Sequence, residues 1–197
     1  MSAEGDPDAR PAVPEWDDAY LDRVAARLAA NYDLRKGFEV RGERFELYGE
    51  LAVRNQKQFL HPSISFAHHD SSEHLFARRV GTVREDELDR LVELGHALAE
   101  EWIVPSDEHY STEFTFALVA DAFDDGVREH VSGFSDRTLL KFGYHGHYEV
   151  NLIVAVPDDE RLLASENADV AAAFAPWEPI EAERSGLLAR IARRLLR

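Results

Sequence analysis

Apolar residues recur at three- and four-residue spacing in two long stretches, and each stretch predicts an amphipathic helix. The first helix is expected from Trp16 to about Asn31, and the second between Thr82 and Pro105. A shorter helix is expected around residues 125–131. The apolar stripes comprise Tyr20, Leu21, Val24, Ala25 and Leu28 in the first helix, and Leu88, Leu91, Val92, Gly95, Leu98, Ala99 and Trp102 in the second.

Elsewhere the apolar period changes to two, which is typical of strands with one buried face. Residues 45–54 and 114–120 show this alternation most clearly. Shorter strands are expected at residues 38–40, around Ile64 and Phe66, and at residues 75–80.

The last two strands are expected to form a hairpin with a three-residue loop at residues 145–147. This register places Phe142 opposite Val150 and Lys141 opposite Asn151. A two-residue loop would move half of the apolar set to the wrong face, so the three-residue loop is preferred.

The resulting order of helices and strands predicts an α+β fold, a mostly antiparallel sheet with helices packed on one face. Residues 16–156 form the single domain, and residues 1–15 read as a disordered acidic lead. The composition of residues 157–183 predicts an acidic, proline-bearing linker with a helical turn near 169–174. Residues 184–197 predict a basic amphipathic helix.

The chain of 197 residues carries a formal net charge of −16, and only three of its basic residues are lysines. This composition resembles that of proteins from halophiles, whose cytoplasm holds molar salt. At 1 M salt the Debye length is roughly 3 Å, so the self-repulsion is largely screened. Acidity is therefore interpreted as adaptation to solvent, and binding of nucleic acid is not expected.

The chain has no cysteine, which excludes disulfides, thiolate catalysis and zinc sites built from cysteine. It also has no apolar run long enough to span a bilayer, and its first residues do not resemble an export signal. The sequence therefore predicts a cytoplasmic protein, with peripheral attachment to a membrane through its basic helix as one option.

Histidines provide the first candidate site, because three of them lie close to Asp70 and Glu73. Imidazole and carboxylate groups together suit a divalent transition metal. The candidate ligands are His68, His69, His74 and, from the expected hairpin, His147. The spacing matches no strict metal-binding signature, and solvated loop residues would give the same pattern.

The polar face of the expected hairpin provides a second candidate, formed by Lys141, Glu149 and Asn151. A lysine in the middle of a strand could bind an anion or transfer a proton. Cross-strand charge pairing without any function explains the same residues. The sequence shows no glycine-rich phosphate loop and no nucleophile elbow.

The segment 184–197 provides a third candidate, because it holds five arginines and no acidic residue. Subtracting these five charges from −16 leaves −21 on residues 1–183. Its apolar face contains Leu187, Leu188, Ile191, Leu195 and Leu196, and its basic wedge contains Arg190, Arg193, Arg194 and Arg197. Such a helix docks on a membrane surface or a protein partner, or folds back on its own acidic domain.

Three stretches resemble an uncharacterised family of small acidic proteins from halophilic archaea. They are RFELYG at residues 44–49, the histidine-rich stretch at residues 68–79, and FSDRTLLKFGY at residues 134–144. The resemblance covers most of residues 16–185. It implies a cytosolic halophile protein and carries no activity with it.

Two hypotheses of function follow from the sequence. The first is a non-catalytic binding or adaptor domain whose basic helix docks to a membrane surface or a protein. The second is a metal-dependent, hydrolase-like enzyme that uses the histidine cluster.

Overall fold

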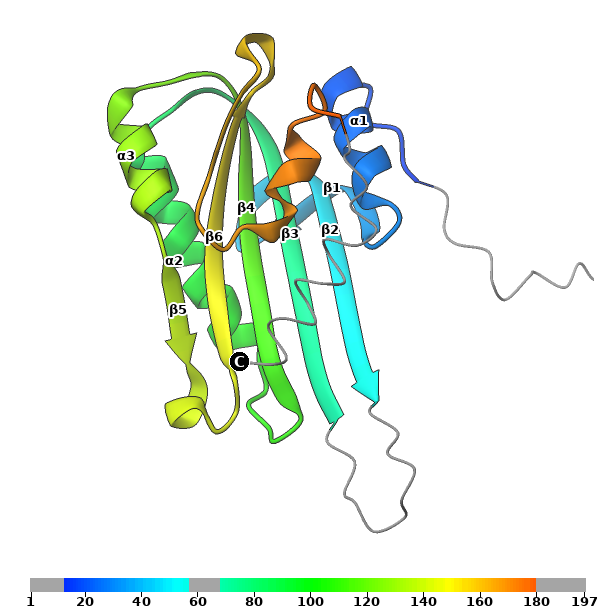
Figure 1. Ribbon diagram of the computed structural model, residues 1–197, viewed down its shortest axis with the longest axis vertical. Helices are drawn as coiled ribbons and strands as arrows, with labels where there is room; N and C mark the ends of the chain where they lie inside the picture. The colour runs from blue at the N-terminus through cyan, green and yellow to red at the C-terminus, as the bar shows by residue number, and fades with distance from the viewer. Residues whose placement is uncertain (1–12, 57–67, 180–197) are drawn as a thin grey trace, which may run out of the picture.

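The computed structural model describes residues 13–56 and 68–179 (Figure 1). Its elements include three 3₁₀ helices, labelled η. They follow the order α1 (Ala19–Leu28), β1 (Asp33–Val40), β2 (Glu43–Gln56), β3 (His68–Val83), α2 (Glu85–Trp102), β4 (His109–Phe123), α3 (Asp125–Gly133), β5 (Asp136–Leu139), η1 (Leu140–Gly143), β6 (His147–Val156), η2 (Pro157–Asp159), β7 (Arg161–Ala164) and η3 (Asp169–Phe174).

The seven strands form one mixed sheet in the order β1-β2-β3-β4-β6-β5, with β7 also paired to β6. The central strands β3, β4 and β6 run parallel, whereas the outer pairs are antiparallel. Parallel neighbours need a crossover, and α2 supplies it between β3 and β4. The predicted α+β class is confirmed. The sheet is mixed and not mostly antiparallel, because its central strands are joined by crossovers and run parallel.

Helices cover both faces of the sheet (Figure 1). On the α2 face, α2 and α3 bury a core that includes Phe76, Phe116 and Leu98. On the opposite α1 face, α1 and η3 bury a second core that includes Val24 and Phe174. The prediction of helices on one face was therefore wrong. The central strands are apolar on both sides over part of their length, so each side needs a cover.

The end of the described chain belongs to the folded domain, although the sequence predicted a linker there. Strand β7 pairs with the second half of β6, and η3 buries Phe174. Tyr20 of α1 donates a hydrogen bond of 2.6 Å to the Phe174 carbonyl. Arg27 donates to the carbonyls of Ala172, Ala175 and Glu178 at 2.9, 2.8 and 2.6 Å. These contacts fix the chain on the α1 face as far as Glu178.

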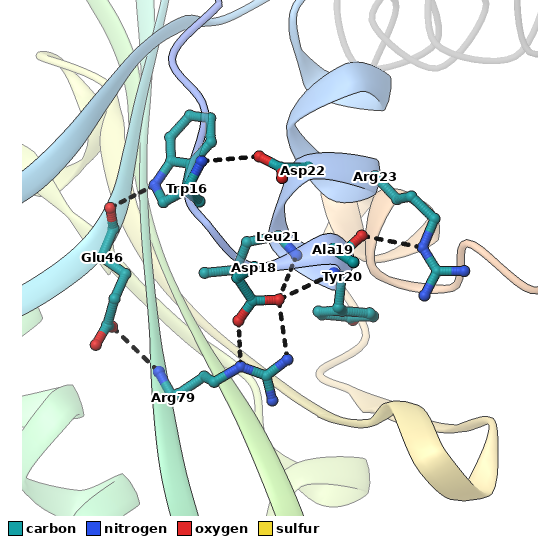
Figure 2. Close-up of polar contacts among 9 residues, drawn as sticks. All are labelled: Trp16, Asp18, Ala19, Tyr20, Leu21, Asp22, Arg23, Glu46 and Arg79. Carbon is teal, nitrogen blue, oxygen red and sulfur yellow. Dashed lines mark hydrogen bonds and ion pairs between the residues drawn. The ribbon is translucent and has the colours of Figure 1, made fainter.

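Helix α1 is anchored to the sheet by the polar contacts in Figure 2. Asp18 caps the helix by accepting two hydrogen bonds from its first amides, and it also pairs with the guanidinium of Arg79 on β3. The hydrogen bond from Arg79 lowers the pKa of the Asp18 carboxyl. Trp16 Nε1 donates to the Glu46 carbonyl of β2 at 2.6 Å. Asp18 thus joins α1 to β3, and Trp16 joins the residues just before α1 to β2.

The predicted hairpin register was wrong. Strand β5 ends at Leu139, which pairs with His147, and the connection includes η1. Lys141 and Phe142 adopt left-handed backbone conformations with φ of 47° and 58°, and Phe142 is 94% exposed. The second half of β6 pairs instead with β7. The free edge of β6 is therefore shared between two short strands, which local alternation could not reveal.

Several expectations fall outside the described residues. They are most of the acidic lead, the strand around Ile64 and Phe66, and the basic helix at 184–197. Within the described part of the chain, no helix is long and apolar enough to cross a membrane.

Candidate functional site

Three glutamates lie side by side across the middle of the sheet on the α1 face. Glu73 of β3 is in register with Glu113 of β4, and Glu113 is in register with Glu149 of β6. Neighbouring strands are about 4.8 Å apart, so the three side chains leave the same face in one line. We call these three residues the carboxylate row. Like charges at this spacing repel, so a cation placed between them is stabilising.

The row is held at both ends by neutral or basic partners. At the β6 end, Arg137 of β5 donates from Nε to Glu149 Oε1 at 2.6 Å, and His147 Nε2 lies 3.3 Å from the same oxygen. Glu149 itself is fully buried. At the β3 end, the Tyr32 hydroxyl donates a hydrogen bond to Glu73 Oε2. The protein therefore already uses a guanidinium to neutralise one member of the row.

The negative field of the site reaches beyond the row. Burial raises the pKa of Tyr32, and the nearby carboxylates of Glu73, Glu113 and Asp169 raise it further. Tyr32 is thus a protonated donor throughout the physiological range. Asp169 is the first residue of η3, so it adds a fourth carboxylate from the element that covers this face.

Asn151 lies two residues after Glu149 on β6, so its side chain adds a hydrogen-bond donor to the same face. Its side chain is 2% exposed, and its Oδ1 accepts from Ser165 Oγ at 3.4 Å. Within the part of the chain that the structure describes, its Nδ2 has no hydrogen-bond partner. A buried amide donor without an acceptor is costly, and a ligand carbonyl would satisfy it.

The position of the row follows from how α1 and η3 cover the face. Both lie over its upper part in Figure 1, above apolar residues such as Ala117 and Ile153. The row lies four residues earlier on β4 and β6, towards the amino ends of the parallel strands. Among the described elements, no helix lies over that lower part. The polar half of the face is therefore the half that no described helix covers.

The structure separates the histidines that the sequence grouped. His74 lies on the α2 face, against Trp102 and Phe114, and its Nδ1 is 2.8 Å from the Tyr48 hydroxyl. His147 lies on the α1 face beside Glu149. The two rings are thus on opposite sides of the sheet. His68 and His69 belong to β3, but their side chains lie outside the described residues.

A metal centre is not formed within residues 13–56 and 68–179. No group of three or more histidine or acidic side chains there is placed to hold a metal ion. The carboxylates of the row are instead set side by side on neighbouring strands by the register of the sheet.

The burial of His74 predicts a pH dependence of stability. Burial lowers its pKa below the usual value of about 6.5, so the unfolded chain binds more protons as the pH falls. This contribution to stability is complete above pH 6.5 and is lost as the pH falls through the folded-state pKa. The variant His74→Gln should remove up to about 1.4 kcal/mol per pH unit from the slope in that window. Urea unfolding at several pH values measures it, and parallel slopes for both proteins would contradict the assignment.

The second candidate site is brought together only in part. Glu149 and Asn151 share the α1 face of β6, but Lys141 lies exposed in η1 and is not opposite Asn151. Their neighbours are instead Glu113 and Thr115 of β4. Glu113 was not among the residues that the sequence pattern pointed to. The available signal was that each central strand carries one glutamate at a polar position just before its apolar alternation begins.

Comparisons with known proteins identify a family and nothing finer. Neither the search of curated proteins nor that of solved structures found a similar chain. A family model described as the domain of unknown function DUF8052 matches residues 17–176, from the cap of α1 to just after η3, and so includes the whole carboxylate row. The chain therefore belongs to the DUF8052 family.

Proposed function

We propose that this protein is a non-catalytic binding domain of the cytoplasm that takes up a basic protein segment on its α1 face. The observation that carries the proposal is the register of Glu73, Glu113 and Glu149 on three neighbouring parallel strands. Arginine side chains of the ligand pair with this row. The ligand's backbone supplies a carbonyl to the Asn151 amide.

Arginine suits the row better than lysine does. Its planar guanidinium presents a fork of donors that can bridge carboxylate oxygens, whereas the ammonium of lysine acts as a point charge. The contact between Arg137 and Glu149 is an internal example of this pairing. Because Glu113 is only 5% exposed, an arginine that reaches it is partly shielded from water and salt.

The acidic composition fits this function in a halophile cytoplasm. Molar salt screens charges separated by more than roughly 3 Å, which is close to the length of a direct ion pair. General attraction between the domain and a basic ligand is therefore weak there. Specific pairs at the row keep most of their strength, so salt favours ligands that contact it directly.

Binding of a short synthetic peptide rich in arginine tests the proposal. The host is the full chain with all five arginines of residues 184–197 replaced by glutamine, here called the neutral-segment variant, so that its own arginines do not compete. The substitutions are Arg184→Gln, Arg190→Gln, Arg193→Gln, Arg194→Gln and Arg197→Gln. Adding Glu73→Gln and Glu113→Gln should weaken binding about tenfold or more, because charge-assisted hydrogen bonds of about 1.5–3 kcal/mol each are lost. Fluorescence anisotropy at about 0.1 M and about 1 M salt measures the affinity.

A matched control has the same net charge with the row intact. Glu100→Gln and Glu129→Gln lie on exposed positions of α2 and α3, away from the α1 face. This control should bind the arginine peptide as its parent does, and a lysine version of the peptide should bind more weakly. Equal loss of binding in both glutamine variants, or no binding at all, would contradict the proposal.

A further inference from the structure

We infer that the carboxylate row is occupied by the chain's own basic segment, residues 184–197, and that an outside partner must displace it. The inference rests on the proposed function, since it names a ligand of that same site. It makes the segment an internal competitor, so that the domain binds only partners basic enough to replace it.

Charge complementarity is the first support. The segment holds five arginines and no acidic residue, whereas the rest of the chain carries −21. The α1 face concentrates part of that negative charge in the row and in Asp169. Self-docking therefore places the one strongly basic stretch of the sequence on a line of carboxylates, where opposite charges attract.

The exit point of the chain is the second support. Arg27 holds the carbonyls of Ala172, Ala175 and Glu178, so the chain leaves the described structure from the α1 face. The row lies on this same face, four residues along β4 from Ala117. The five residue steps from Pro179 to Arg184 span up to about 17 Å when extended. The segment therefore begins a few residues after the point where the chain leaves the face that carries the row.

Apolar complementarity is the third support. Leu51 of β2 is in register with Glu73, and Leu34 of β1 packs beside Gly49 on the same face. Both leucines are only partly buried. They form an apolar border along the β2 side of the row.

The predicted helix matches this border and the row at the same time. At about 100° per residue, Leu187 and Ile191 lie about 40° apart, and Arg194 and Arg190 follow on one flank of Leu187. A helix that rests its leucines on Leu34 and Leu51 therefore directs two arginines towards the carboxylates. Arg197 lies about 20° beyond Arg190 on the same flank, and Arg193 lies farthest around the wheel.

A single spin label on the full chain tests the contact. The native chain has no cysteine, so Ala189→Cys provides a unique attachment point, and it lies on the far side of the helical wheel from Ile191. Amide signals of β3, β4 and β6 near the row should broaden, and those of α3 should not. Adding Glu73→Gln and Glu113→Gln should abolish the broadening, whereas Glu100→Gln with Glu129→Gln should preserve it. Broadening that is absent, or that survives loss of the row, would overturn the inference.

Peptide titration separates this inference from the proposed function. The wild-type chain should bind the arginine peptide about tenfold more weakly than the neutral-segment variant does, because its own segment competes. Equal affinities would overturn the inference and leave the proposed function standing. Failure of the neutral-segment variant to bind the peptide would overturn the proposed function itself.

Discussion

Replacing Arg137 by alanine is expected to lower the free energy of unfolding by about 3 kcal/mol. Glu149 is fully buried, and Arg137 donates to its Oε1 at 2.6 Å. Without that guanidinium, a carboxylate held out of water loses a charged partner, and the desolvation cost is no longer offset. Urea unfolding followed by tryptophan fluorescence measures the loss.

Two further variants make this result specific. Arg90→Ala removes an exposed ion pair with Asp86, and it should cost no more than about 0.5 kcal/mol. Adding Glu149→Leu to Arg137→Ala should recover part of the stability, because an apolar side chain has no charge to leave unpaired. An Arg137→Ala variant as stable as Arg90→Ala would contradict the role given to this pair.

Replacing Gly95 by valine is expected to cost about 2–3 kcal/mol. Helix α2 lies so close to the sheet that a Cβ at position 95 would be 2.8 Å from Val150 Cγ2 and 3.1 Å from Phe116 Cε2. Both neighbours are fully buried, so neither can move without disturbing the core. The small gain in helix propensity from replacing glycine does not offset this overpacking.

Gly133 supplies the control for that variant. It ends α3, and a Cβ added there would meet no atom within 4 Å. Gly133→Ala should therefore leave the unfolding midpoint nearly unchanged or raise it slightly. If Gly95→Val were as stable as Gly133→Ala, the close packing of α2 against β4 and β6 would be incorrect.

Local periodicity was enough to predict the three α-helices. The structure has α1 at Ala19–Leu28, α2 at Glu85–Trp102 and α3 at Asp125–Gly133, each within or close to the predicted bounds. Each of these segments carries its own apolar stripe. Pairing of the strands depends instead on crossovers and on contacts between distant segments, so the parallel centre and the place of β7 could not be predicted from local patterns.

The candidate site shows the same limit. Histidines adjacent in sequence suggested one cluster, but neighbours in a strand point to opposite faces, so His74 and Glu73 are on different sides of the sheet. Glu113 and Glu149 are far apart in sequence and meet only through the parallel register. Lys141 was assigned to a strand face because the left-handed turn that exposes it leaves no mark in the apolar pattern.

The most direct test of the account is an NMR titration of the neutral-segment variant with the arginine peptide. The largest shifts are expected at the backbone amides of Glu73, Glu113 and Glu149 and at the side-chain amide of Asn151, whose Nδ2 gains an acceptor. Shifts confined to α2 and α3, with the carboxylate row and the Asn151 side chain unchanged, would contradict it.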